Sequence, residues 1–381
     1  MRQTAIYNQP SAISDPEMKY IDEFRDPTLA SSLLADIHAR ATRPVRFMEF
    51  CGGHTHAIFR HGLRQMLPPT VQLHSGPGCP VCVTADADLD RAIAMSKLPG
   101  VILTTFGDML KVPGSHGSLQ TAKAEGADVR VVYSTLDALQ IAREHPERKI
   151  IFLGIGFETT APTVAASILQ AEAEGLHNLT VFSLHKLTPP ATRAILDAGE
   201  SRLAGIIGPG HVTTIIGSQA WEFLSQDYHV PCAIAGFEPL DILQAVAALV
   251  EMAEGGQPAV VNTYSRSVRP EGNRAALDIL CRVFETSDAE WRGLGRVPAS
   301  GLALRHEYAH FDAVLAFPVD PGPTRQHTGC RCGDVVRGAV EPPECLLFGR
   351  ACTPARPIGP CMVSAEGACA AWYQYGDIGH E

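Results

Sequence analysis

The sequence predicts an α/β protein with two parallel-sheet βα domains that face a cleft, followed by a small C-terminal domain rich in cysteine. Three observations support this prediction. Short β-branched or apolar runs alternate with segments of helical spacing, small and polar residues follow the ends of these runs, and the tail is rich in Gly, Pro and Cys. Alternating strands and helices are typical of parallel sheets covered by helices.

Nine segments have the length and composition of buried strands. They are residues 45–50, 71–74, 101–105, 129–134, 149–154, 179–184, 205–208, 232–235 and 259–263. Nine strands fit two domains of ordinary size better than one sheet, so we place a boundary near residues 143–149. A repeated Gly-Phe-Glu at 156–158 and 236–238 is consistent with duplication, although three residues are weak evidence.

Helices are predicted at both ends of this strand series. Asp26 is a suitable N-cap with Pro27 at the first helical position, which predicts a helix over 26–41. Further helices are predicted over 84–98 and 273–285. The expected organisation is a helical lead-in at 1–44, one α/β domain at 45–145, a second at 146–265 and a C-terminal domain at 266–381.

Composition narrows the function classes. The net charge of −10 and the absence of a Lys/Arg-rich run argue against nucleic acid as a partner. No run of about 18 apolar residues and no signal-peptide pattern is present, so we expect a cytoplasmic protein without a membrane segment. In that reducing compartment, eleven cysteines indicate metal binding or redox chemistry rather than structural disulfides.

Small, polar and cysteine residues follow most of the predicted strands. These groups are residues 51–54, 76–79, 106–108, 156–158, 185–186, 208–211 and 236–238. The carboxyl ends of parallel strands lie at one edge of a sheet, where ligands bind. Two such edges that face each other would form a cleft.

The tail contains four cysteines with gaps of seven, nine and eight residues. They are Cys345, Cys352, Cys361 and Cys369. Zinc sites usually have paired ligands two to four residues apart, so the wide gaps favour an iron–sulfur cluster, with zinc or unligated thiols as alternatives. Cys330 and Cys332 look like part of a surface turn and are interpreted as bystanders, although either could replace one of the four.

Cys79 and Cys82 form a CxxC motif that can cycle between dithiol and disulfide. The alternative is half of a zinc-binding knuckle. The motif lies just before the predicted helix over 84–98, whose N-terminus would favour a thiolate.

Cys51 and His54 lie at a strand-to-helix turn with two glycines between them. A thiolate and an imidazole at this spacing can share one iron, zinc or copper ion, whereas the alternative for Cys51 is a buried apolar residue. Asp108 and Glu158 are acidic side chains at other strand ends and are further candidates for the reacting site, with a helix cap or a surface charge as the alternative for each. No glycine-rich nucleotide-binding fingerprint is present.

The combined motifs resemble one known family. The segments FMEFCGGHTHAIFRHG, HSGPGCPVC, TTFGDMLKVPGS, GFETTAP, GPGHV, GFEPLDIL and CLLFGRACTPARPIGPCMVSAEGAC, from about residue 45 onward, resemble the hydrogenase maturation factor HypD family. The resemblance implies two α/β domains, a [4Fe–4S] cluster, and a redox-active scaffold on which the Fe(CN)2CO unit of [NiFe] hydrogenase is assembled. It also implies a HypC-type chaperone and a HypE-type cyanide donor as partners.

The resemblance assigns roles to three groups of cysteines. Cys51, with His54 beside it, is the expected ligand of the transient iron, and Cys79 and Cys82 are the redox pair. The cluster ligands are the four tail cysteines, Cys345, Cys352, Cys361 and Cys369. Two other functions stay open, namely a stand-alone iron–sulfur-dependent disulfide oxidoreductase and a zinc protein that only recruits partners.

Overall fold

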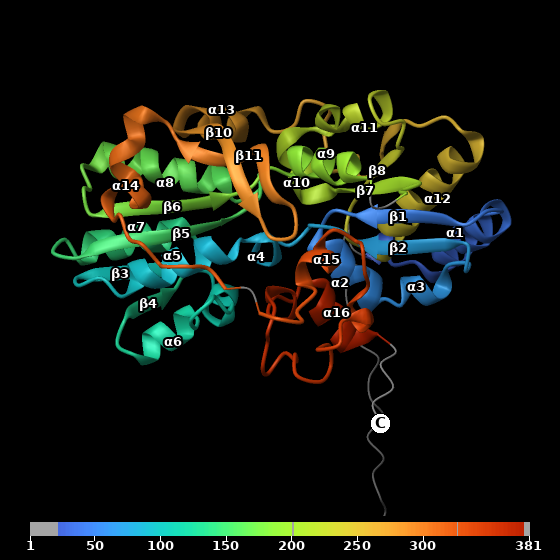
Figure 1. Ribbon diagram of the computed structural model, residues 1–381. Helices are drawn as coiled ribbons and strands as arrows, with labels where there is room; N and C mark the ends of the chain where they lie inside the picture. Colours follow the sequence, from blue (N-terminus) through green and yellow to red (C-terminus); the bar gives the residue numbers. More distant parts are fainter. Residues whose placement is uncertain (1–21, 200–201, 326, 377–381) are drawn as a thin grey trace, which may run out of the picture.

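The computed structural model describes residues 22–199, 202–325 and 327–376. Two lobes lie side by side, each built on a parallel sheet, and the C-terminal segment lies against the junction between them (Figure 1). The α/β class and the two parallel sheets predicted from the sequence are confirmed.

The first sheet has five parallel strands in the order β2-β1-β7-β8-β9. These strands are β1 (Val45–Glu49), β2 (Val71–Ser75), β7 (Gly205–Pro209), β8 (Cys232–Ala235) and β9 (Val260–Asn262). The second sheet has four parallel strands in the order β4-β3-β5-β6. They are β3 (Val101–Thr105), β4 (Asp128–Val131), β5 (Lys149–Gly156) and β6 (Leu179–His185). All nine predicted strands are present.

The predicted boundary near residues 143–149 is wrong, because it divides the second sheet. The chain leaves the first sheet after β2, builds the second sheet without interruption, and returns at β7, where Gly205 pairs with Phe47 of β1. Local apolar patterns identify strands but not their pairing partners. The expected domains at 45–145 and 146–265 therefore do not correspond to the two sheets.

In each sheet, the second strand in sequence lies on one side of the first strand and the third strand lies on the other side. The direction in which strands are added to the sheet therefore reverses between the first and third strands. These positions are the β1/β7 junction and the β3/β5 junction. Ligands of open α/β sheets bind at the carboxyl ends of the strands beside such a reversal. The two Gly-Phe-Glu repeats follow the third strand of one sheet and the fourth of the other, so they are not equivalent positions.

Helices cover the faces of both sheets (Figure 1). Up to β7 they are α1 (Pro27–Arg40), α2 (Gly52–Arg60), α3 (Leu63–Met66), α4 (Pro80–Val83), α5 (Asp86–Ser96), α6 (Leu119–Ala124), α7 (Thr135–Glu144), α8 (Ala161–Glu174) and α9 (Thr188–Ala198). After β7 they are α10 (Gly210–Ile216), α11 (Phe223–Gln226), α12 (Pro239–Gly255), α13 (Arg274–Val283), α14 (Ala313–Ala316), α15 (Cys332–Val336) and α16 (Ala368–Tyr375). Short 3₁₀ turns are η1 (Asp22–Phe24), η2 (Gly107–Lys111), η3 (Ser218–Trp221), η4 (His306–Phe311), η5 (Pro342–Glu344) and η6 (Pro360–Met362).

The three helices predicted individually are present as α1, α5 and α13. The Asp26 carboxylate accepts a hydrogen bond from the backbone N–H of Thr28 at 2.7 Å, as expected of an N-cap. None of the helices among residues 22–199, 202–325 and 327–376 is long and apolar enough to cross a membrane.

An antiparallel hairpin that the sequence did not predict follows α13. It consists of β10 (Phe284–Trp291) and β11 (Gly295–Leu304), and β11 packs against β6 and α9. Residues of β10 between its buried ends are mostly exposed and polar, so the strand lacks an apolar run. Since α13 also packs against α8, the predicted C-terminal domain at 266–381 is too long, and its first part belongs with the second sheet.

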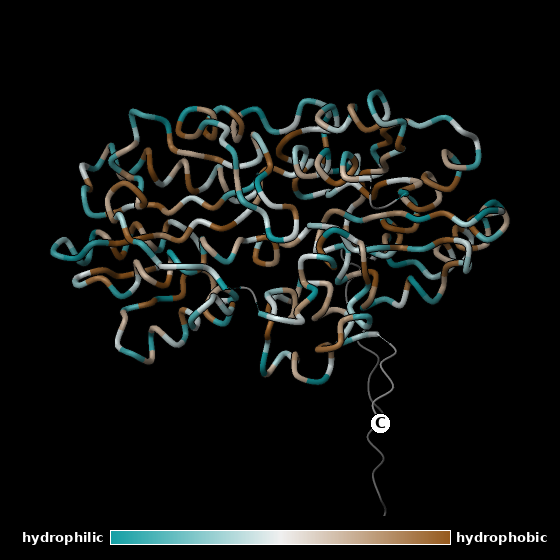
Figure 2. Tube along the Cα trace, viewed as in Figure 1, coloured by the Kyte–Doolittle hydropathy of each residue, from teal (hydrophilic) through white to brown (hydrophobic). Residues whose placement is uncertain are grey.

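Apolar side chains fill the space between sheets and helices, and the apolar parts of the trace run through both sheets (Figure 2).

Phe152 lies in the middle of β5 and is fully buried. We expect Phe152→Ala to lower the free energy of unfolding by about 3–5 kcal/mol, because it leaves a large cavity. Thermal or urea denaturation measures this loss. Tyr133→Ala is the control, since 93% of the Tyr133 surface is exposed, and an equal loss in both variants would contradict the expectation.

Candidate functional site

A cavity of about 610 Å³ lies between the carboxyl ends of the two sheets. Residues after β1, β2 and β7 of the first sheet and after β3, β4 and β5 of the second line it, together with the segment before α16. One lining residue from each of these parts, in the same order, is Cys51, Gly78, His211, Asp108, Val132, Phe157 and Glu366. The cleft predicted from the strand-end residues is therefore confirmed.

Cys51 lies in the wall of this cavity at the end of β1. It precedes the first turn of α2, and only 8% of its surface is exposed. Burial raises the pKa of the Cys51 thiol to about 12, and the nearby Glu366 carboxylate adds to this shift. The free thiol is therefore protonated at neutral pH, and a bound cation would favour its thiolate form.

Two glycines bring neighbouring segments against Cys51. A Cβ atom at Gly78 would overlap the Cys51 backbone, 2.7 Å from its carbonyl carbon, and one at Gly52 would overlap the backbone of Glu366. The Gly52 N–H donates to the Gly78 carbonyl oxygen at 2.9 Å. These contacts join the Cys51 turn, the CxxC loop and the C-terminal segment.

We expect Gly78→Ala to displace the Cys51 turn, because the added methyl group would meet backbone atoms that cannot rotate away. The variant should lose at least about 2 kcal/mol of stability, and alkylation of Cys51 should become faster. Gly107→Ala is a matched control in the same cavity, since its Cβ would lie 3.6 Å from the nearest Val131 atom. Equal Cys51 alkylation rates in wild type and Gly78→Ala, followed by mass spectrometry, would contradict this expectation.

His54 lies in the first turns of α2 and is completely buried. Its Nε2 is 2.9 Å from the carbonyl oxygen of Gly236 and 3.2 Å from that of Ala235, so Nε2 carries the proton. Nδ1 has no hydrogen-bond partner among the described residues and keeps a free lone pair. Burial lowers the pKa of His54 to about 4, so the ring is neutral at pH 7 and can bind a metal ion.

The ring of Phe237 separates His54 from the cavity-lining His211. Its centroid is 4.7 Å from the centroid of His54 and 3.9 Å from that of His211, and both pairs are stacked. Phe237 belongs to the second Gly-Phe-Glu segment. This segment therefore fixes the orientation of His54 from two directions, through the Gly236 carbonyl and the Phe237 ring.

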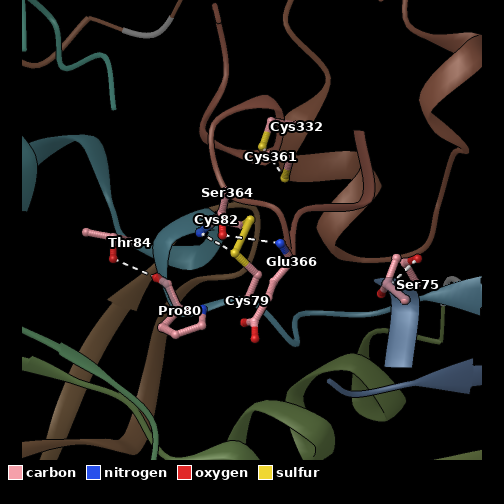
Figure 3. Close-up of a disulfide and its surroundings, with 10 residues drawn as sticks. Ser75, Cys79, Pro80, Cys82, Thr84, Cys332, Cys361, Ser364 and Glu366 are labelled. Carbon is pink, nitrogen blue, oxygen red and sulfur yellow. Dashed lines mark hydrogen bonds between the residues drawn. A yellow bond between two sulfur atoms is a disulfide. The ribbon is translucent and has the colours of Figure 1, made fainter. Parts of the chain in front are cut away.

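Cys79 and Cys82 form a disulfide, as the CxxC motif permits. Both are buried, and Cys79 is the N-cap of α4, where its sulfur accepts a hydrogen bond from the Cys82 N–H at 3.2 Å. Figure 3 shows this disulfide in one close-up with Glu366 and with Cys332 and Cys361. Helix α4, which carries the disulfide, contacts both α15 and η6, which carry the latter two cysteines.

Six cysteines of the C-terminal segment line one small cavity. They are Cys330, Cys332, Cys345, Cys352, Cys361 and Cys369. The remaining wall is largely apolar and includes Val335, Phe348 and Met362. The interpretation of Cys330 and Cys332 as surface bystanders is therefore wrong, since Cys332 is buried and both share the cavity with the four predicted ligands.

Cys332 and Cys361 form a close pair within this set, with their sulfur atoms 2.7 Å apart. The contact lowers the pKa of Cys332 and raises that of Cys361, because one proton is held between the two sulfurs. The sulfur of Cys352 accepts a hydrogen bond from the Ile358 N–H at 3.3 Å. Backbone N–H groups directed at sulfur are typical of iron–sulfur sites.

No three acidic, His or Cys side chains of the described residues are arranged around a single metal ion. This result argues against a compact site such as a zinc centre, in which four ligands surround one ion. A cubane cluster is held at four separate iron corners, so its thiolates lie farther apart around a larger volume. Six thiols around one shielded cavity fit this donor set.

The two candidate acids have different positions. Asp108 lines the cleft, whereas Glu158 does not. The Glu158 carboxylate instead accepts hydrogen bonds from the N–H of Thr188 at 2.7 Å and from its hydroxyl at 3.1 Å, at the start of α9. The expectation that Glu158 takes part at the reacting site is thus not supported by its position, and its role here is to hold β5 and α9 together.

Glu366 is the cleft residue that sequence reasoning missed. It lies between Cys361 and Cys369, lines the cavity beside Cys51, and has its pKa raised by burial and by Asp108. The sequence places Glu366 three residues before Cys369 in the tail motif, but no local pattern indicates that this segment reaches the first sheet.

We expect Glu158→Gln to be more stable than wild type at pH 8, by on the order of 1 kcal/mol or more. Burial raises the Glu158 pKa from 4.5 to about 7, so the folded protein keeps a proton that the unfolded chain loses, and stability falls as pH rises from 4.5 to 7. Thermal midpoints between pH 5 and 8 measure this slope. Glu174→Gln is the control, because Arg143 lowers the Glu174 pKa to about 2 and this carboxyl stays ionised throughout. Parallel slopes for wild type and Glu158→Gln would contradict the expectation.

Several proteins similar to this chain are named as hydrogenase maturation or formation proteins. The family model HypD, described as the hydrogenase formation hypA family, matches residues 28–376. The chain is 50% identical over 368 residues to the hydrogenase maturation factor HypD of Azotobacter vinelandii, covering 94% of this chain and 97% of that one. It is 48% identical to HypD2 of Bradyrhizobium diazoefficiens over 94% and 97% of the two chains, and 44% identical to HypD of Escherichia coli over 94% and 98%. The chain therefore belongs to the HypD family of hydrogenase maturation factors.

Proposed function

We propose that this maturation factor is a redox-active scaffold on which the Fe(CN)2CO unit of [NiFe] hydrogenase is assembled in the cytoplasm. Its partners are a HypC-type chaperone, which shares the iron, and a HypE-type protein, which donates cyanide. The observation that carries the proposal is the Cys51 thiol in a cavity between two sheets, with the CxxC disulfide and a six-cysteine cavity connected to it.

Cys51, in the cavity wall, suits an iron that carries cyanide and CO, and the second ligand that we propose is His54, which is buried behind the wall and does not itself line the cavity. A thiolate is a soft, basic ligand, and the imidazole Nδ1 of His54 has a free lone pair. The cavity opens to the surface and has room for the thiol of a second protein. Loss of the Cys51 proton accompanies iron binding, and the neighbouring Glu366 carboxylate is a suitable acceptor.

The C-terminal cavity suits a [4Fe–4S] cluster. Sulfurs 2.7 Å apart cannot occupy two different corners of one cubane, so at most one of Cys332 and Cys361 is a ligand. Cys330, Cys345, Cys352 and Cys369 line the same cavity and lie outside this close pair. These four are the ligands that we propose, with Cys330 in place of Cys361 in the set predicted from spacing. When bound, the cluster supplies single electrons.

This assignment leaves Cys332 and Cys361 as a dithiol next to the Cys79–Cys82 disulfide. Thiol–disulfide exchange between the pairs reduces Cys79 and Cys82 while Cys332 and Cys361 become oxidised, so two electrons move. Release of cyanide from a thiocyanate on the partner consumes two electrons, since cyanide leaves with the bonding pair. The dithiol at Cys79 and Cys82 can supply both.

Iron and sulfide analysis of the anaerobically isolated complex with a HypC-type chaperone tests this function. We expect iron beyond the amount matched by labile sulfide, and Cys51→Ala should lose that excess while keeping the sulfide. Cys361→Ser should keep the sulfide, whereas Cys330→Ser should lose it. Zinc without sulfide would instead favour the recruiting role, and turnover of general disulfides unaffected by Cys51→Ala would favour a stand-alone oxidoreductase.

A further inference from the structure

The loop that follows Cys345 carries an exposed surface of unusual composition. Its outward residues are Leu346, Gly349, Arg350, Ala351, Pro354, Ala355 and Arg356. Leu346 is 81% exposed, which is high for a leucine. From Cys345 to Ala365 the chain contains only two charged residues, Arg350 and Arg356. We call this surface the loop face.

Both arginines of the loop face are available to a partner. Neither makes an ion pair or a side-chain hydrogen bond with any residue in the described ranges, whereas Arg331 and Arg337 nearby are both paired with Asp334. Glu344, just before the loop, accepts a hydrogen bond from the Glu341 N–H. The loop face is thus apolar and positive on a protein whose net charge is −10.

The inner side of the same loop forms the wall of the six-cysteine cavity. Cys345, Leu347, Phe348 and Cys352 all line that cavity. One layer of chain therefore separates the loop face from the proposed ligands. None of the loop-face residues lines the cleft, and the red C-terminal segment lies below the two sheets in Figure 1. A partner on this face would leave the cleft open for other proteins.

We propose that the loop face is the docking site of an acidic one-electron carrier protein that reduces this maturation factor. The inference rests on the proposed function, because it needs a redox group in the six-cysteine cavity. Docked proteins exchange electrons over short distances, and the loop face is an exposed surface directly over that cavity. A cationic patch on an acidic protein attracts and orients an acidic partner that the remaining surface repels.

The electron count requires repeated docking. Reduction of the Cys79–Cys82 disulfide to two thiols takes two electrons and two protons. Each reduced carrier gives one electron and leaves oxidised by one, so two carriers dock in turn, and the protons come from solvent. A patch that binds weakly and releases quickly suits this exchange better than a large permanent interface.

Stopped-flow oxidation of a reduced, acidic plant-type [2Fe–2S] ferredoxin by the anaerobic full-length protein tests the docking site. We expect the double variant Arg350→Glu/Arg356→Glu to slow the reaction at least roughly tenfold at low salt, with a much smaller difference at about 0.5 M salt. The variant Arg350→Lys/Arg356→Lys should stay near the wild-type rate. Leu346→Asp should slow the reaction at all salt concentrations.

A matched control reverses the charge of two exposed arginines on α13, in the variant Arg274→Glu/Arg282→Glu. This variant should oxidise ferredoxin at the wild-type rate. Equal rates of ferredoxin oxidation for wild type and the loop-face variants would overturn the docking site. The docking site would also be overturned if the loop-face variants lost binding to the HypE-type partner but oxidised ferredoxin at the wild-type rate. Reduction by dithionite separates the two proposals. If dithionite reduces wild type and variants equally, the redox site stands whatever the ferredoxin result, whereas a protein that accepts no electrons from dithionite contradicts the proposed function itself.

Discussion

Replacement of Cys51 by alanine is expected to abolish hydrogenase maturation. In a host that depends on this protein, hydrogenase activity should fall at least roughly 100-fold, because removal of a ligand costs more than the 10–100-fold typical of changes around a ligand. Cys51 is the free thiol in the wall of the cleft, and Cys79 and Cys82 beside it are joined to each other. The measurement is hydrogen-dependent dye reduction in cell extracts.

The matched control for this variant is Cys281→Ala. Cys281 is also a free cysteine, but it is exposed on α13, far along the chain from the cleft residues. It should leave hydrogenase activity unchanged. Both variants should keep the labile sulfide of the purified protein. Substantial hydrogenase activity with Cys51→Ala would show that the iron is held elsewhere.

Replacement of Cys82 by serine should have an effect of similar size for a different reason. Serine cannot form the disulfide, so no two-electron couple remains beside the cleft. We expect hydrogenase activity to fall at least roughly 100-fold, while the thermal midpoint changes little, because closing so short a loop restricts the unfolded chain only slightly. Activity and thermal midpoint are measured on the same preparation.

Cys232→Ala is the control for Cys82→Ser, since Cys232 is a fully buried cysteine in β8. It should keep hydrogenase activity even if it lowers stability by about 1 kcal/mol. If Cys82→Ser and Cys232→Ala retained equal activity, the redox role of the CxxC pair would be excluded.

Much of the fold follows from local sequence. Strands such as β3 and β8 were predicted residue for residue, because buried parallel strands are short apolar runs bounded by glycine or polar residues. The hairpin after α13 was missed, since one of its strands is polar. The assignment of strands to sheets was also missed, because the pairing of Phe47 with Gly205 depends on residues far apart in sequence.

The candidate site shows the same division between local and distant information. Cys51 and the CxxC pair follow strand ends, so their meeting at a sheet edge could be predicted. The positions of Cys332 and Glu366 could not, because both depend on how a tail without regular spacing folds against α4 and α2. For Glu158, the sequence left open both a role at the reacting site and a helix cap, and its carboxylate accepts a hydrogen bond from the first residue of α9.

Infrared spectroscopy of the complex with the HypC-type chaperone tests the central claim most directly. The complex is isolated anaerobically, in parallel for wild type and Cys51→Ala, at equal protein concentration. The assembly role predicts stretching bands of metal-bound cyanide and CO in the wild-type complex and their absence in Cys51→Ala. An intact wild-type complex without these bands, or the same bands in both proteins, would contradict it.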